Sequence, residues 1–117
     1  MKGQSLYKRF RFAWQGLIAA FAHEISFRTH LVAAVAAVGA TLWIRPPLVW
    51  FALVMIMIGL MLAAELFNTA LEHALDGLHP DQAQFVRVTK DCAAGAVLVL
   101  SVCAALVFVL MLAEVWG

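Results

Sequence analysis

Residues 48–76 read LVWFALVMIMIGLMLAAELFNTALEHALD, and this stretch decides the fold. No charged residue occurs before Glu65, so the first part of the stretch predicts a helix that crosses a hydrocarbon core. Polar side chains then return at Glu65, Asn68, Glu72 and Asp76, in steps of three and four residues. Because an α-helix turns about 100° per residue, these four side chains lie on one face of one helix.

This row of side chains, the polar stripe (Glu65, Asn68, Glu72 and Asp76), indicates a functional site. An acid within a bilayer costs about 3 kcal/mol or more, and such residues usually mark a site of activity. The structural alternative is a row of hydrogen bonds that joins helices. An asparagine serves that purpose readily, but two or three carboxylates need a cation or protons. We therefore favour the functional interpretation.

The composition favours a membrane protein. Of 117 residues, 65% are hydrophobic, and the mean hydropathy is +0.94, which is more apolar surface than one small soluble core can bury. The length allows a single domain, residues 1–117. The net charge of +1 gives no general case for nucleic-acid binding.

We predict an all-α integral membrane protein with three transmembrane helices, at about 29–45, 48–74 and 90–116. The first span ends at Arg45 and two prolines, because proline removes a backbone donor and disfavours helix before itself. Residues 5–27 form an amphipathic helix, basic on one side and rich in leucine and aromatic residues on the other. Such a helix lies in the membrane interface. The alternative is an ordinary surface helix packed on a soluble core.

The basic residues predict the orientation in the membrane. They gather before the first span and in the loop at 77–89 or just after it: Lys2, Lys8, Arg9, Arg11, Arg28, Arg87 and Lys90. By the positive-inside rule, the N-terminus and this loop are cytoplasmic and the C-terminus is extracytoplasmic. Arg45 alone falls on the other side, where Trp43, Trp50 and Trp116 form an aromatic belt.

Further charged residues lie near the depth of the polar stripe. Glu24 stands near the end of the amphipathic helix, and Asp91 opens the last span beside Lys90. Carboxylates and water are suitable ligands for Mg²⁺, and the lysine suits a phosphate. Taken singly, Glu24 pairs with Arg28 on a surface helix and Lys90 reaches to the interface. No P-loop or Rossmann motif is present, so these residues alone do not separate an enzyme from an ion pathway.

Three motifs in order resemble the prokaryotic diacylglycerol kinase family, which includes undecaprenol kinases. Residues 65–76 read ELFNTALEHALD, similar to the family's E-x-x-N-[ST]-A-[IL]-E-x-x-x-D signature. Lys90 and Asp91 precede a run of small residues, as in the family's second motif. Upstream, residues 14–21 and 24–28 are similar to its surface helix. The resemblance covers nearly the whole chain.

The resemblance implies ATP as phosphoryl donor, Mg²⁺ as cofactor and a homotrimer whose sites are shared between subunits. By position, Glu65 is the general base, and Glu24 and Glu72 bind the metal. The nucleotide positions are Phe12, Glu24, Asn68, Glu72, Asp76, Lys90 and Asp91. The lipid positions are Trp14, Ala94 and Glu65. Phe12 departs from the family's usual tyrosine, which leaves stacking on the adenine without a hydroxyl.

The implied function is phosphorylation of diacylglycerol to phosphatidic acid at the cytoplasmic face of a bacterial inner membrane. Undecaprenol is the alternative substrate, because His79, Pro80 and the small residues 93–97 look closer to that branch. An alternative of another class is a small oligomeric ion or proton pathway, which leaves Lys90, Asp91 and the surface helix without a role. A non-catalytic membrane scaffold is a third.

Overall fold

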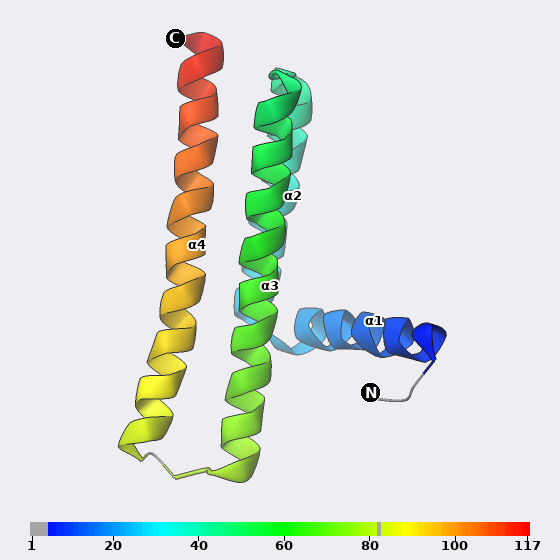
Figure 1. The fold of residues 1–117 in the computed structure, drawn as a ribbon, viewed down its shortest axis with the longest axis vertical. Helices are drawn as coiled ribbons and strands as arrows, with labels where there is room; N and C mark the ends of the chain where they lie inside the picture. Colours follow the sequence, from blue (N-terminus) through cyan, green and yellow to red (C-terminus); the bar gives the residue numbers. More distant parts are fainter. Residues whose placement is uncertain (1–4, 82) are drawn as a thin grey trace.

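The computed structural model describes residues 5–81 and 83–117, and every regular element within them is an α-helix. The helices are α1 (Leu6–His23), α2 (Ile25–Ile44), α3 (Leu48–Leu78) and α4 (Gln84–Trp116). Figure 1 shows α3 and α4 running antiparallel side by side, with α2 next to α3 and α1 leaving at a steep angle. Lys2, counted above for the orientation, lies outside the described residues.

Three of these helices, α2, α3 and α4, are long and apolar enough to cross a membrane. At most 17% of the apolar window of each is buried within the chain. Lipid or neighbouring chains must therefore cover most of this surface. The predicted fold class, three spans preceded by an N-terminal helix, is confirmed.

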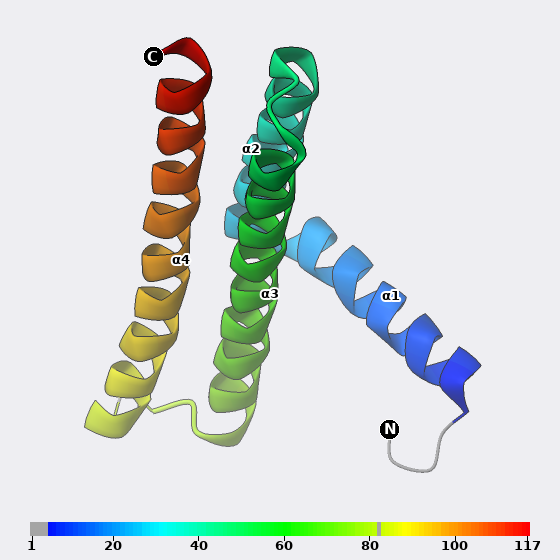
Figure 2. The ribbon, with the colours of Figure 1, turned by 45° about the horizontal axis from the view of Figure 1, so that its top comes forward.

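Helix α1 stands apart from the bundle (Figure 2). Ser5 caps its N-terminus, where the serine hydroxyl accepts a hydrogen bond from the Lys8 backbone N–H at 3.2 Å. Ala20 is its one buried residue, while most of its large apolar side chains are exposed: Leu6, Tyr7, Phe10, Trp14, Leu17, Ile18 and Phe21. An exposed apolar row on a helix that also carries basic residues is typical of a helix in the membrane interface.

The helix ends differ from the expected ones at both sides of the first span. Glu24, placed above within a helix over 5–27, instead has extended backbone, with φ −118° and ψ 109°, between α1 and α2. Helix α2 then begins at Ile25 rather than near residue 29. The reason is Phe27, which is 3% exposed, so its packing stabilises the first turn of α2.

The second loop is also shorter than expected. Helix α3 continues through Gly77 to Leu78 rather than ending near residue 74, and the His79 N–H closes it on the Leu75 carbonyl at 2.7 Å. Helix α4 begins at Gln84 rather than near residue 90, because Val86 is 1% exposed and packs in the first turn. Asp91 therefore lies within α4 and does not open it.

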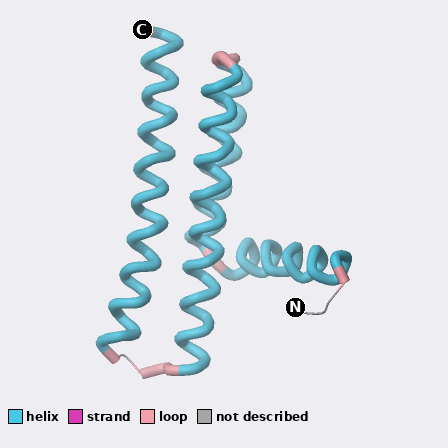
Figure 3. Tube along the Cα trace, in the orientation of Figure 1, coloured by secondary structure: helices cyan, strands magenta, loops and turns pink. Residues whose placement is uncertain are grey.

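The α2–α3 connection is a tight turn, and Figure 3 shows it at the opposite end of the bundle from the α3–α4 loop. Arg45 adopts the left-handed conformation, with φ 56° and ψ 57°, and its N–H bonds the Thr41 carbonyl at 3.0 Å. Pro46 and Pro47 follow and separate the helices. The predicted break at these prolines is confirmed.

Candidate functional site

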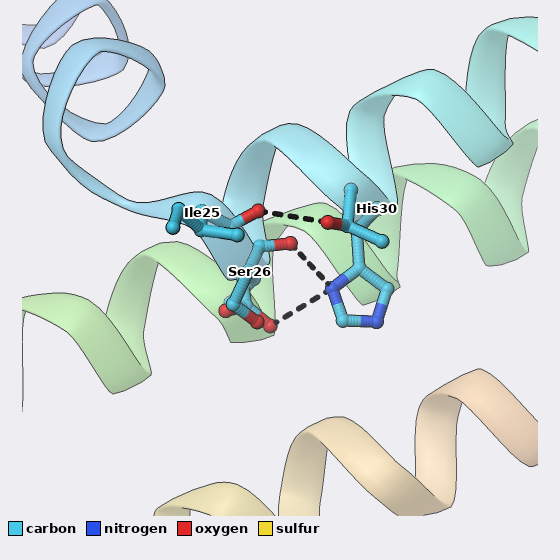
Figure 4. Close-up of polar contacts among 5 residues, drawn as sticks. Ile25, Ser26 and His30 are labelled. Atoms are coloured by element: carbon cyan, nitrogen blue, oxygen red, sulfur yellow. Dashed lines mark hydrogen bonds and ion pairs between the residues drawn. The ribbon is translucent and has the colours of Figure 1, made fainter.

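The first residue of the polar stripe, Glu65, is buried at 2% exposure and contacts α2. Its Oε2 lies 3.3 Å from Nδ1 of His30. The same ring nitrogen lies 3.0 Å from the backbone carbonyl of Ser26 (Figure 4). Glu65 is thus a buried carboxylate with a histidine partner on the neighbouring span.

Glu24 contacts α3 at His73, beside the polar stripe. From the break between α1 and α2, its Oε1 reaches Nε2 of His73 at 3.1 Å. His73 directly follows Glu72 on α3, so the contact brings Glu24 to the turn that carries Glu72. A cavity of about 540 Å³ lies beside this contact, and α1 and α3 line it with mainly apolar residues.

The last residue of the stripe, Asp76, pairs with α4. Its Oδ1 lies 2.7 Å from Nζ of Lys90, across the end of the α3–α4 pair. The length is that of a strong charged hydrogen bond. The Asp76 side chain is nevertheless 64% exposed, so water screens the attraction between the two charges. The contact therefore orients Lys90 more than it stabilises the fold.

The other expected site residues have varied surroundings. Asn68 is half-buried, and within the described residues its Oδ1 has no hydrogen-bond partner. Phe12 is half-buried, and the Arg11 guanidinium lies 5.8 Å from its ring centroid. Glu72 is half-buried, and three positions are exposed: Trp14, Asp91 and Ala94.

The structure brings these residues together in pairs rather than in one cluster. Within residues 5–81 and 83–117, no three histidine, cysteine, aspartate or glutamate side chains converge closely enough to hold a metal ion. The two ends of the stripe are also well separated, because eleven residues of helix place Glu65 and Asp76 about 16 Å apart along α3. Lys90, held at Asp76, is correspondingly far from Glu65 of its own chain.

Two histidines without a predicted role lie against carboxylates of the site, His30 at Glu65 and His73 at Glu24. A signal for His30 was available, since a histidine in an apolar span usually needs a polar partner. The identity of that partner was not available, because it depends on how α2 packs on α3. His73 follows the signature residue Glu72, and no motif in the sequence predicts a role for it.

The fold and these contacts define a small three-span membrane protein with a row of carboxylates and a lysine toward one end of α3 and α4. The chain belongs to the prokaryotic diacylglycerol kinase family, because the sequence model of that family matches residues 11–112.

Relatives of this chain are named as two kinds of lipid kinase, diacylglycerol kinase and undecaprenol kinase. The chain is 35% identical over 104 residues to a diacylglycerol kinase of Synechocystis, covering 88% of this chain and 59% of that protein. It is 30% identical to an undecaprenol kinase of Bacillus subtilis, covering 90% of this chain and 85% of that one. A diacylglycerol kinase of Escherichia coli is 26% identical, with 91% and 87% covered. The family is thus one of lipid kinases.

Proposed function

We propose that this chain transfers the γ-phosphoryl group of ATP to the hydroxyl of a membrane lipid, with diacylglycerol as substrate and phosphatidic acid as product. The observation that carries the proposal is Glu65, a carboxylate buried at 2% exposure within a membrane-spanning helix of a kinase family. Burying an acid there is costly, so its presence favours a chemical role.

Glu65 acts as the general base. The lipid hydroxyl oxygen forms a bond to the γ-phosphorus while the bond from that phosphorus to the β,γ-bridging oxygen breaks, which releases ADP. The hydroxyl proton passes to the Glu65 carboxylate, as a positioned base allows. Phosphoryl transfer otherwise needs positioning and neutralisation of charge, which the remaining polar residues supply.

Glu24 and Glu72 are the proposed ligands of Mg²⁺, which neutralises the charge of the phosphates when bound. Their chemistry fits, because Mg²⁺ prefers oxygen donors and is commonly held by one or two carboxylates with water and nucleotide oxygens. The contact of Glu24 with His73, the residue after Glu72, supports a common location. Phe12 stacks on the adenine, and the other nucleotide-binding positions are Asn68, Asp76, Lys90 and Asp91.

The lipid approaches from the membrane side. Trp14, on the apolar face of α1, is exposed to the interface, and Ala94 is an exposed small residue on α4. We place both beside the lipid together with Glu65. In the proposed orientation, α1 and the 79–83 loop face the cytoplasm at a bacterial inner membrane, where ATP is available. The C-terminus is extracytoplasmic.

A homotrimer with shared sites is part of the proposal. The apolar faces of α2, α3 and α4 are mostly exposed in one chain, which leaves room for neighbours. The separation of about 16 Å between Glu65 and Asp76 supports sharing, since Lys90 at Asp76 does not reach Glu65 of its own chain. A ring of identical subunits brings the two groups together across an interface.

Undecaprenol is the second candidate substrate. Specific residues favour it: His79 and Pro80 in the loop, and the small residues 93–97 on α4. The similarity to an undecaprenol kinase over 90% of this chain points the same way. The proposed chemistry at Glu65 is unchanged, because both substrates offer a hydroxyl group.

The test is phosphoryl transfer from labelled ATP with Mg²⁺ to each lipid, presented separately in mixed micelles. We expect transfer to diacylglycerol by the wild type and its loss in Glu65→Gln, with nucleotide binding retained. Glu114→Gln is the matched control, because it makes the same change at an exposed position near the far end of α4. Transfer to undecaprenol alone would favour the second candidate. Transfer to neither lipid by folded protein would contradict the proposal.

A further inference from the structure

The His30 ring is oriented by its own helix. Its Nδ1 lies 3.0 Å from the Ser26 carbonyl, one turn earlier in α2 (Figure 4). A carbonyl oxygen only accepts hydrogen bonds, so this contact requires the hydrogen to be on Nδ1. The ring is therefore held in the tautomer that donates from Nδ1, with its plane fixed against the α2 backbone.

The same Nδ1–H faces the buried carboxylate of Glu65. Oε2 of Glu65 lies 3.3 Å from Nδ1, and an ionised carboxylate only accepts. The ring nitrogen thus donates its hydrogen to the Ser26 carbonyl and makes a close polar contact, without a hydrogen bond, with Oε2. Since Oε2 is occupied, Oε1 remains to accept a hydrogen from the substrate. This contact fixes which oxygen of the base is free.

From this geometry we infer that His30 is the positioning residue for Glu65, a role that rests on the proposed function. It acts through the carboxylate: the polar contact of Nδ1 with Oε2 holds the carboxylate and directs Oε1 toward the lipid hydroxyl. Other expected site residues belong to α1, α3, α4 or the α1–α2 break, so His30 gives α2 a part in the site. A base held in one orientation is productive, whereas a small misplacement slows the reaction strongly.

The contact of His30 with Glu65 differs from the contact of His73 with Glu24 in how far water reaches it. The His73 side chain, which contacts Glu24, is 69% exposed, so water can replace it. The Glu65 side chain is 3% exposed and has no such substitute. Loss of the His30 contact leaves the buried carboxylate without this polar partner, so the carboxylate is free to rotate.

The experiment compares three substitutions of His30 in the full-length protein. His30→Leu removes the donor, and we expect kcat to fall about tenfold or more while KM for ATP stays within about twofold. His30→Asn places an amide nitrogen close to the position of Nδ1, so it should recover most of the lost kcat. His30→Gln places its amide near the position of Nε2 and should not. Thr29→Val is the control, because it removes an exposed hydroxyl that bonds within α2.

A second arm repeats His30→Leu in the Glu65→Gln background. If His30 acts through Glu65, the substitution causes no further loss of residual transfer there, whereas an independent effect would add. Equal activity of His30→Leu and wild type, or of His30→Asn and His30→Gln, would overturn the inference and leave the proposed function intact. Where His30→Leu does not fold, the Asn and Gln variants decide. A wild type inactive on both lipids overturns the proposed function first and the inference with it.

Discussion

The residues of the polar stripe differ in burial, and this difference suits them to different roles in the site. Glu65 is buried and relies on one histidine, so its environment is fixed by the protein. Asp76 is exposed, and its contact with Lys90 is open to water. A buried carboxylate suits a proton acceptor held in one orientation, whereas a pair open to water suits a lysine that must release its aspartate to bind phosphate.

Lys90 provides a prediction at this scale. We expect Lys90→Met to lower kcat/KM for ATP about tenfold or more, because a compact cation near the transferred phosphate is lost. The thermal unfolding midpoint should change little, since the partly exposed pair with Asp76 contributes under about 1 kcal/mol. Steady-state kinetics and thermal unfolding in detergent check both. Arg87→Met is the control, because it removes one positive charge from an exposed position one turn away.

The site was only partly predictable at the residue scale. Helical periodicity alone placed Glu65, Asn68, Glu72 and Asp76 on one face, because positions on one helix follow from local geometry. The partner of Glu65 did not follow, since His30 lies on another helix and meets it only through α2–α3 packing. Contacts between helices depend on side-chain packing that sequence spacing does not encode.

At the scale of elements, apolar length predicted the three spans, and the prolines predicted the α2–α3 turn. The helix ends were less predictable. Gly77 suggested an end, but one glycine near the end of α3 costs about 1 kcal/mol, too little to stop it. The break at Glu24 has no proline or glycine beside it. It arises where α1 turns away from the bundle, which is a tertiary effect.

Arg45 provides a prediction for the α2–α3 turn. It is the one described residue other than glycine with a positive φ, and its Cβ is strained in the left-handed region. Arg45→Gly removes that strain and should raise the free energy of unfolding by about 0.5–1 kcal/mol. Arg45→Ala, which loses the same side chain but keeps Cβ, should show no gain. Thermal unfolding of both variants in one detergent provides the measurement, and equal stability would contradict a strained turn.

At the scale of the whole molecule, the positive charges predict which side of the membrane holds the site. In a protein freed of Cys92 and Cys103 by alanine substitution, Asp81→Cys should react with an impermeant thiol reagent only after cells are permeabilised. Leu48→Cys, at the other end of α3, should react in intact cells. The cysteine-free parent is the control. The reverse pattern would place the 79–83 loop outside and deny the site its supply of cytoplasmic ATP.

The proposed sharing of sites between subunits rests on the distance along α3. Glu65 and Asp76 are about 16 Å apart, so Lys90 held at Asp76 is too distant to serve Glu65 of the same chain. In a cyclic trimer the interface is head to tail, so each chain gives its lysine to one neighbour and receives one from the other. Each site then needs two chains.

Mixing two impaired variants tests this arrangement. In trimers assembled at random from equal amounts of Glu65→Gln and Lys90→Met chains, about a quarter of the interfaces join an intact Glu65 to an intact Lys90. We therefore expect about a quarter of the wild-type transfer rate on mixing, which is above the residual rate of either variant alone. Variants mixed without subunit exchange are the control and should show only their residual rates. No recovery from mixed trimers would mean that a single chain supplies both groups, with Lys90 leaving Asp76 during the reaction.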